Sequence, residues 1–198
     1  MADRQTLDVY DSQTARYAAR AQGEPSESAA LQAMIDALPP GARVLDLGCG
    51  PGHFSAAMAR AGLSPDPVDA SAEMVAHAAR EYGLLARQAA FSDLAAEAAY
   101  DAVWANFSLL HAPKLEFPGH LARIRRALKD GGLLHLGMKM GEGEARDTLG
   151  RFYAYYGEEE LAELVIAAGF AVTGTRTGTG TGLDEAGFAW CFLTARAT

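Results

Sequence analysis

The sequence predicts an α/β protein, a three-layer α/β/α sandwich around a mostly parallel sheet. Val44 and Leu45 begin a short apolar run that ends at Asp46, and a glycine-rich turn (48–52) and an alanine-rich segment (55–61) follow directly. A buried strand, a tight turn and a helix in this order form the first unit of an open α/β sheet. Strand and helix patterns then alternate along the rest of the chain, which extends the same architecture to the C-terminus.

The composition is that of one globular domain. The chain has 198 residues, of which 49% are apolar and 21% charged, enough to bury a sizeable core. The net charge of −8 argues against a nucleic-acid surface. Cys49 and Cys191 are the two cysteines, no metal-ligand spacing occurs, and no apolar run approaches membrane length. We therefore expect a protein of the reduced cytoplasm without metal, nucleic-acid or membrane partners; the oligomeric state stays open.

Two helices are expected before the first strand. Leu7, Tyr10 and Tyr17 recur near whole helical turns, which predicts an amphipathic helix over 7–21. A second helix carries the apolar positions of 31–38 and stops at Pro39-Pro40-Gly41.

The glycine turn is a candidate binding site. Gly48, Gly50 and Gly52 permit positive φ and let a ligand lie against bare backbone, and the free N–H groups of the next helix favour an acceptor-rich group. A tight turn without ligand is the alternative. A dinucleotide site requires G-x-G-x-x-G, whereas the third glycine falls one residue early here, which disfavours a nicotinamide cofactor.

The segment Asp46-Leu47-Gly48-Cys49-Gly50-Pro51-Gly52 resembles motif I of the class I S-adenosylmethionine-dependent methyltransferases. The resemblance implies a seven-stranded Rossmann-like sheet of order 3-2-1-4-5-7-6 with an antiparallel last strand. It also implies S-adenosylmethionine as cofactor, with S-adenosylhomocysteine as product. The motif residues and His53 are then candidate cofactor contacts, and Asp46 is expected to organise the ammonium side of the cofactor, directly or through water.

Asp69 is the candidate ribose ligand. It lies 23 residues after Asp46 at the end of the second predicted strand, close to the interval at which an acidic residue binds ribose hydroxyls in nucleotide-binding α/β folds. The alternative is a cap of the helix predicted over 72–82, although Ser71 can cap it instead. Ala70, Ser71 and the inward-facing Met74 complete this part of the expected cofactor site.

Residues 87–94 resemble the third strand and the turn after it, where the family places a polar side chain on the adenine amino group. We assign that contact to Asp93, with Ser92 as the second choice.

The fourth strand begins at Tyr100 and places Asn106 and Phe107 at its carboxyl end, where doubly wound sheets bind ligands. Many amino-methyltransferases of nucleic acids and proteins carry an acidic residue or Asn followed by Pro-Pro-aromatic here. This chain has Asn106-Phe107-Ser108 without prolines, which counts against methylation of a base amine. His111 follows as a cofactor or substrate contact, or as a structural histidine.

The remaining elements follow in order: a helix over 119–129 with a solvated basic face, a strand over 133–140, a loop over 141–157, a helix over 158–168 and a strand over 170–176. Residues 177–182 repeat Thr and Gly and are expected to form a pliable connection to a last strand over 188–195. The loop 141–157 is dense in charges and aromatics and leaves a central strand, as specificity loops do.

The expected function is methyl transfer to an unidentified small molecule. We divide the chain into a helical cap (1–40), a cofactor core (41–140), the substrate-side loop (141–157) and a C-terminal part (158–198). His111, Arg151 and Tyr155 are the candidate catalytic residues, although the loop charges can instead pair among themselves and pin the loop. Tyr17 is expected to face the cofactor, or else to pack on the sheet. A cofactor-binding protein without catalysis and a nicotinamide-dependent reductase are the alternative functions.

Overall fold

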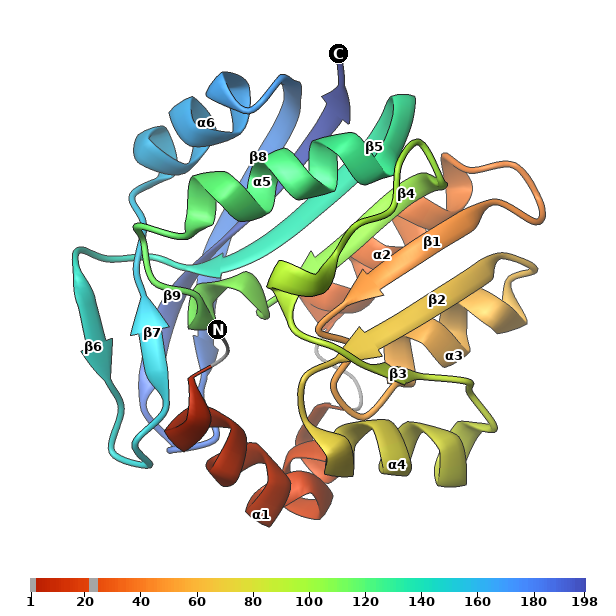
Figure 1. Ribbon diagram of the computed structural model, residues 1–198. Helices are drawn as coiled ribbons and strands as arrows, with labels where there is room; N and C mark the ends of the chain where they lie inside the picture. Colours follow the sequence, from red (N-terminus) through yellow and green to blue (C-terminus); the bar gives the residue numbers. More distant parts are fainter. Residues whose placement is uncertain (1–2, 22–24) are drawn as a thin grey trace.

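The structure is a computed structural model that describes residues 3–21 and 25–198. Its centre is a seven-stranded sheet of order β3-β2-β1-β4-β5-β9-β8, in which only β9 runs antiparallel to its neighbours (Figure 1). This confirms the expected strand order and the antiparallel last strand. The strands are β1 (Arg43–Leu47), β2 (Ser64–Asp69), β3 (Arg87–Gln88), β4 (Tyr100–Asn106), β5 (Leu128–Lys139), β8 (Phe170–Thr181) and β9 (Gly187–Ala197).

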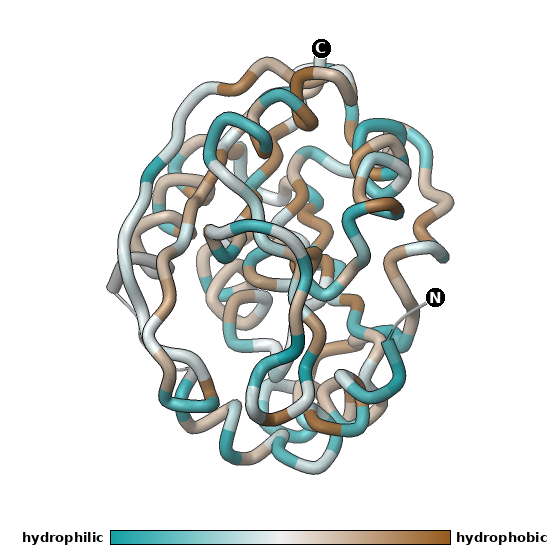
Figure 2. Tube along the Cα trace, turned by 90° about the vertical axis from the view of Figure 1, so that its left-hand side faces the viewer, coloured by the Kyte–Doolittle hydropathy of each residue, from teal (hydrophilic) through white to brown (hydrophobic). Residues whose placement is uncertain are grey.

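Helices cover both faces of the sheet, and the strands show why. Successive side chains of a strand point to opposite faces, and in β4 Val103 and Ala105 join one core cluster while Ala102 and Trp104 join another. Helices α5 (Phe117–Ala127) and α6 (Glu158–Ala167) pack on the first cluster. Helices α2 (Pro25–Asp36) and α3 (His53–Arg60) pack on the second. The three-layer architecture is therefore confirmed, and hydrophobic residues run through the middle of the trace (Figure 2).

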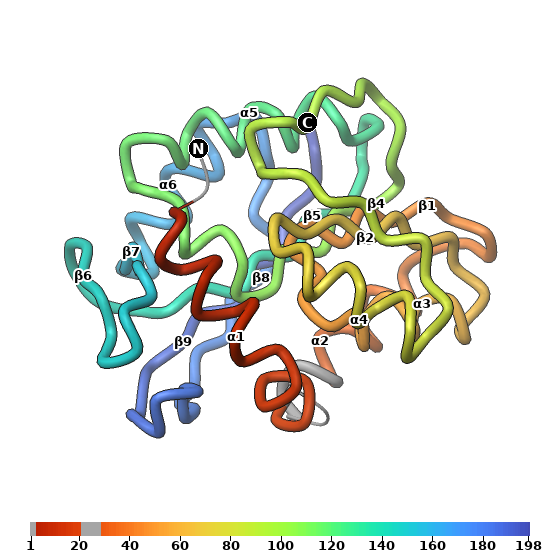
Figure 3. Tube along the Cα trace, turned by 60° about the horizontal axis from the view of Figure 1, so that its bottom comes forward, coloured from red at the N-terminus to blue at the C-terminus, as the bar shows by residue number. Residues whose placement is uncertain are grey.

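Helix α1 (Arg4–Ala21) lies across the side of the sheet at which the parallel strands end (Figures 1 and 3). It packs against α4 (Ala72–Tyr82). On the other side, its Thr6 hydroxyl accepts a hydrogen bond of 2.8 Å from the Phe152 amide. The helix has a kink at Gln13 (φ −121°, ψ 17°). It thus covers the edge at which a doubly wound sheet binds ligands.

The expectation of a pliable connection over 177–182 is wrong. Strand β8 extends to Thr181 and pairs with β9 over its whole length, down to the pair Thr181 and Gly187. Alternating β-branched threonines favour an extended strand, and the glycines between them leave room for aromatic rings of β9. A Cβ atom on Gly178 would lie 2.3 Å from the Trp190 ring.

The segment 141–157 contains a hairpin where a loop was expected. Strands β6 (Glu144–Arg146) and β7 (Phe152–Ala154) pair antiparallel and form a separate two-stranded sheet beside the main one. Two short helical turns, η1 (Phe91–Asp93) and η2 (Leu109–His111), follow β3 and β4. No helix within the described residues is long and apolar enough to cross a membrane.

Candidate active site

Two cavities open at the carboxyl ends of the parallel strands and share one wall. The first encloses about 810 Å³, its open mouth included, and the second about 880 Å³. Five residues line both: Tyr10, Tyr17, Asn106, Phe107 and His111. The first cavity contains most of the residues that the sequence assigned to a cofactor: Tyr17, Gly48, Gly50, Asp69, Ala70, Met74, Ser92, Asn106 and Phe107.

The glycine turn forms the floor of the first cavity. Gly48 and Gly50 have φ of 79° and 52°, values that side chains with a Cβ atom rarely adopt. A Cβ on Gly48 would lie 2.3 Å from Cβ of Ser108, and one on Gly50 would lie 3.6 Å from the Tyr17 ring. Bare backbone therefore faces the cavity at this turn, which fits a ligand that lies directly against the chain.

Asp69 faces the same cavity from the end of β2. Its two carboxylate oxygens accept backbone N–H groups of Gly50 and Ser71, both at 2.8 Å. Ser71, and not Asp69, caps α4, because its hydroxyl accepts the Met74 amide. The same hydroxyl donates to a carboxylate oxygen of Asp11 on α1. Burial raises the pKa of Asp69. Asp69 thus ties the glycine turn to β2 and keeps its remaining lone pairs toward the cavity.

Asp46 lies beneath the turn and lines neither cavity. It is 1% exposed, and its Oδ2 accepts a hydrogen bond of 2.7 Å from the Ser55 hydroxyl. Burial, together with the charge of Asp69, raises its pKa to about 7. Asp46 thus holds the first turn of α3 to β1, and its expected contact with the cofactor, directly or through water, stays a prediction.

Cys49 and Gly52 likewise support the turn from below. Cys49 is 3% exposed, and burial raises the pKa of its thiol. Gly52 precedes α3 with φ of 90°, and a Cβ there would lie 2.7 Å from that of Ala78. The two residues pack the turn against α4 instead of lining a cavity, because only alternate positions of the turn face outward.

Asp93, the first choice for the adenine contact, does not line the first cavity, whereas the second choice, Ser92, does. The Asp93 carboxylate turns back and accepts the Ala90 amide at 2.9 Å, which closes the η1 turn. An Asp three residues after the start of a short turn satisfies a local backbone N–H more easily than it reaches a ligand.

Asn106 and Phe107 form the shared wall at the end of β4. Oδ1 of Asn106 lies 3.1 Å from Nε2 of the buried His135, so the amide oxygen points into the sheet. Phe107 adopts φ of 52°, a conformation that costs a non-glycine residue free energy and is concentrated at functional sites. Its ring packs on Phe188 and Phe192.

His53 belongs to the second cavity and not to the first. Neither ring nitrogen has a hydrogen-bond partner, and burial lowers its pKa to about 4, so the imidazole is neutral at pH 7. As the first residue of α3, His53 projects away from the turn and toward the ring of Phe54, so it does not line the first cavity with the other predicted cofactor residues.

His111 connects three elements. Its Nδ1 lies 2.6 Å from the Phe152 carbonyl oxygen, and its Nε2 lies 2.8 Å from the Tyr10 hydroxyl. A carbonyl only accepts, so Nδ1 carries the proton and Nε2 accepts from Tyr10. Burial lowers the pKa of His111 to about 4. Both nitrogens are thus engaged, which does not favour direct removal of a proton from a substrate.

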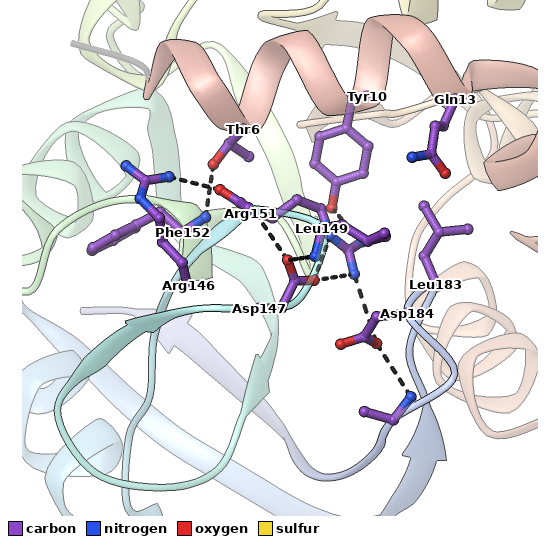
Figure 4. A network of polar contacts seen from close by, with 12 residues as sticks. Thr6, Tyr10, Gln13, Arg146, Asp147, Leu149, Arg151, Phe152, Leu183 and Asp184 are labelled. Carbon is purple, nitrogen blue, oxygen red and sulfur yellow. Dashed lines mark hydrogen bonds and ion pairs between the residues drawn. The ribbon is translucent and has the colours of Figure 1, made fainter.

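Arg151 lines the second cavity and anchors the loop after β6 (Figure 4). It is 2% exposed and forms ion pairs with Asp147 (2.6 Å) and Asp184 (3.9 Å). Nη1 also donates to the Tyr10 hydroxyl at 3.4 Å. The alternative of charges that pair among themselves is therefore realised at Arg151, although its guanidinium still borders the cavity.

Tyr155 lines neither cavity, and Tyr153 takes the place that we assigned to it. Strand β7 ends at Ala154, so the alternation that points Tyr153 inward is lost before Tyr155. The sequence also missed Phe188 and Trp190, which line the second cavity from β9. Their only signal was a strand end on the binding side of the sheet.

The fold is a doubly wound sheet with two adjoining cavities at the carboxyl ends of its parallel strands. Residues 44–132 match the family described as a methyltransferase domain. The chain is similar to the ubiquinone biosynthesis O-methyltransferase of Xanthomonas campestris pv. campestris (strain B100), at 42% identity over 108 residues. That match covers 49% of this chain and 43% of the relative, so less than half of the relative's length is represented.

Two solved structures extend the similarity to the whole sheet. The 1,6-didemethyltoxoflavin-N1-methyltransferase of Burkholderia thailandensis is 26% identical with a TM-score of 0.79, covering 98% of this chain and 88% of that one. A methyltransferase of Methanosarcina mazei has a TM-score of 0.71 at 20% identity, over 82% and 95% of the two chains. Residues 44–132 thus match a methyltransferase domain, and the whole sheet is similar to those of solved S-adenosylmethionine-dependent methyltransferases.

Proposed function

We propose that this protein transfers a methyl group from S-adenosylmethionine to a small-molecule acceptor. The observation that carries the proposal is the shared wall of the two cavities. A donor against the glycine turn and an acceptor in the second cavity meet only at Asn106, Phe107 and the side chains opposite them. The 1,6-didemethyltoxoflavin and S-adenosylhomocysteine bound in the Burkholderia enzyme support the same division into two sites.

The residues of the first cavity fit the cofactor. Bare backbone at Gly48 and Gly50 suits a group that lies along the turn, and the Asp69 carboxylate is placed to accept ribose hydroxyls. Ser92 and Met74 border the far part of the cavity, where adenine would lie. When bound, S-adenosylmethionine supplies a methyl carbon that bonds to the acceptor atom while the electron pair of the broken bond stays on sulfur.

The protein's own contribution is placement and exclusion of water. Helix α1 covers the opening, with Tyr10 and Tyr17 between the cavities. Holding two reactants in contact removes much of the entropic barrier of a bimolecular reaction. No carboxylate or histidine of the described part stands ready as a strong base at the shared wall, since His111 is neutral and engaged on both nitrogens. We propose that residues 3–21 act as the cap.

Isothermal titration calorimetry with S-adenosylhomocysteine and with NADH tests the cofactor. We expect S-adenosylhomocysteine to bind and NADH not to bind. Asp69→Ala should weaken S-adenosylhomocysteine by about 1.5–3 kcal/mol, the range for hydrogen bonds to a charged group. Transfer of a labelled methyl group to a panel of small phenols and heteroaromatics then separates an enzyme from a binder. Binding of NADH in place of S-adenosylhomocysteine would reject the proposal.

A further inference from the structure

Lys139 is a buried lysine that no anion neutralises. It is the last residue of β5 and is 8% exposed. Its Nζ lies over two aromatic rings, 3.9 Å from the centroid of Tyr153 and 4.4 Å from that of Phe188. Its ammonium forms no ion pair or hydrogen bond within the part of the chain that the structure describes. A charge is rarely buried without a partner of opposite charge. A bound anionic group would supply that partner for Lys139.

The charged side chains that line the cavity of Lys139 are positive. Arg20, Lys139 and Arg151 are its charged lining residues, and no Asp or Glu of the described chain is among the residues that line it. Arg151 is already paired with Asp147 and Asp184. Arg20 donates to the Thr181 carbonyl at the rim of the cavity. Lys139 is therefore a buried cation of the cavity that is not paired with a carboxylate of the described chain.

The walls of the same cavity are aromatic. The aromatic residues that line it include Tyr17, Phe54, Phe107, Tyr153, Phe188 and Trp190. Aromatic walls pack a planar ring over both of its faces, while a flexible aliphatic chain leaves them poorly filled. The cavity thus combines aromatic walls with a buried lysine that has no carboxylate partner among the described residues.

We propose that the second cavity binds a planar aromatic acceptor as its phenolate, with the ionised oxygen at Nζ of Lys139. The inference rests on the proposed methyl transfer, for which it names the substrate class. The phenolic proton passes to solvent when the acceptor binds, and the charged oxygen is a better nucleophile than the neutral hydroxyl. Lys139 is the residue that makes this ionisation favourable, so no protein base is needed.

The charges around Lys139 agree with this role. Burial, followed by the charge of Arg151, lowers the pKa of Lys139 to about 8, against the opposing effects of Asp184 and Asp147. A phenolate placed beside the ammonium would raise that pKa again and so keep Lys139 charged at neutral pH.

The test uses 4-nitrophenol, whose phenolate absorbs visible light, and 4-nitroanisole, a neutral compound of the same shape. Absorbance titrations are run on the full chain with and without S-adenosylhomocysteine. Wild type should bind 4-nitrophenol as the phenolate and lower its apparent pKa by about one unit, a tenfold preference for the anion. Lys139→Met should abolish the shift but still bind 4-nitroanisole, and Lys139→Arg should restore it. Lys129→Met, which removes an exposed lysine paired with Asp101, is the matched control.

Two results would overturn the inference: wild type that binds 4-nitroanisole as tightly as 4-nitrophenol, or a Lys139→Met protein that still ionises the probe. Because the first result needs no variant, poor folding of Lys139→Met leaves the test intact. Calorimetry with S-adenosylhomocysteine distinguishes the two proposals. Normal binding with no probe ionisation rejects only the phenolate site, whereas absence of binding rejects methyl transfer itself.

Discussion

The hydroxyl of Tyr10 donates a hydrogen bond of 2.8 Å to Nε2 of His111, across 101 positions of the sequence. This bond joins α1 to the η2 turn after β4. The Nδ1 proton of the same imidazole bonds to the Phe152 carbonyl, which adds β7 to the connection. The cap, the sheet and the hairpin therefore meet at one neutral histidine on the wall between the two cavities.

Tyr10→Phe should loosen the cap. The change leaves a buried ring nitrogen of His111 without its donor, which costs about 1–3 kcal/mol. Urea denaturation should show that loss, and the affinity for S-adenosylhomocysteine should fall as well, because Tyr10 lines the cofactor cavity. Tyr155→Phe is the matched control, since Tyr155 lines neither cavity. Equal stability of the two variants would show that the Tyr10 hydroxyl does not hold α1 in place.

The sheet and the cofactor edge could be predicted because local signals and topology agree there. Apolar runs, a glycine turn and an acidic residue at the end of β2 each depend on neighbouring residues alone, and parallel strands bring their ends together. Asp69 was placed in this way, and the structure has it at the first cavity.

Side-chain direction was the part that the sequence did not determine. Asp93 and Asp46 satisfy a nearby N–H or O–H group and turn away from the cavity. His53 faces the acceptor side because of where α3 begins. The contact of Lys139 with the Phe188 ring depends on the antiparallel pairing of β9 with β5, which no local pattern shows. These side-chain directions depend on rotamers or on long-range contacts, and no periodic sequence pattern predicts them.

Ser92→Ala and Asp93→Ala should separate binding from turn stability. Ser92 lines the cofactor cavity, so its loss should weaken S-adenosylhomocysteine by about 0.5–1.5 kcal/mol with little effect on unfolding. Asp93 accepts the Ala90 amide, so its loss should lower the melting temperature instead. Calorimetry and thermal unfolding of both variants give the four values needed. If Asp93→Ala weakens S-adenosylhomocysteine binding and Ser92→Ala does not, Asp93 is the adenine contact.

Gly48→Ala should be far more damaging than Gly62→Ala. Both glycines have positive φ, 79° and 83°, so each substitution pays a similar backbone cost of about 1–2 kcal/mol. A Cβ on Gly62 meets nothing within 4 Å, whereas one on Gly48 lies 2.3 Å from Cβ of Ser108. The collision also displaces the Ser108 hydroxyl from the Leu47 carbonyl, to which it donates at 2.6 Å.

Overpacking at Gly48 destabilises the fold by about 1–3 kcal/mol more. Chemical denaturation should therefore give Gly48→Ala a free energy of unfolding lower than that of Gly62→Ala by about this amount. The affinity for S-adenosylhomocysteine should fall in the first variant alone. If the two glycine variants unfold at the same denaturant concentration, the close approach of the turn to Ser108 is not a feature of the folded protein.

Asp46 should make the protein less stable as the pH rises from about 4 to about 7. Its pKa is raised from 3.8 to about 7 in the folded protein. Within that window the folded chain keeps a proton that the unfolded chain has released, and a folded state that binds more protons loses stability as they become scarce.

Asp46→Asn cannot titrate and retains an oxygen for the Ser55 hydroxyl. The variant should therefore lose less stability across the window, by at most about 1.4 kcal/mol per pH unit. Urea denaturation at half-unit intervals of pH measures this difference. Asp101→Asn is the matched control, because the hydrogen bond from Lys129 lowers the pKa of Asp101 below 3.8. Its contribution therefore changes below this window, and the variant should follow the slope of the wild type between about pH 4 and about pH 7. Parallel stability curves for wild type and Asp46→Asn would mean that the Asp46 carboxylate is not buried beneath the glycine turn.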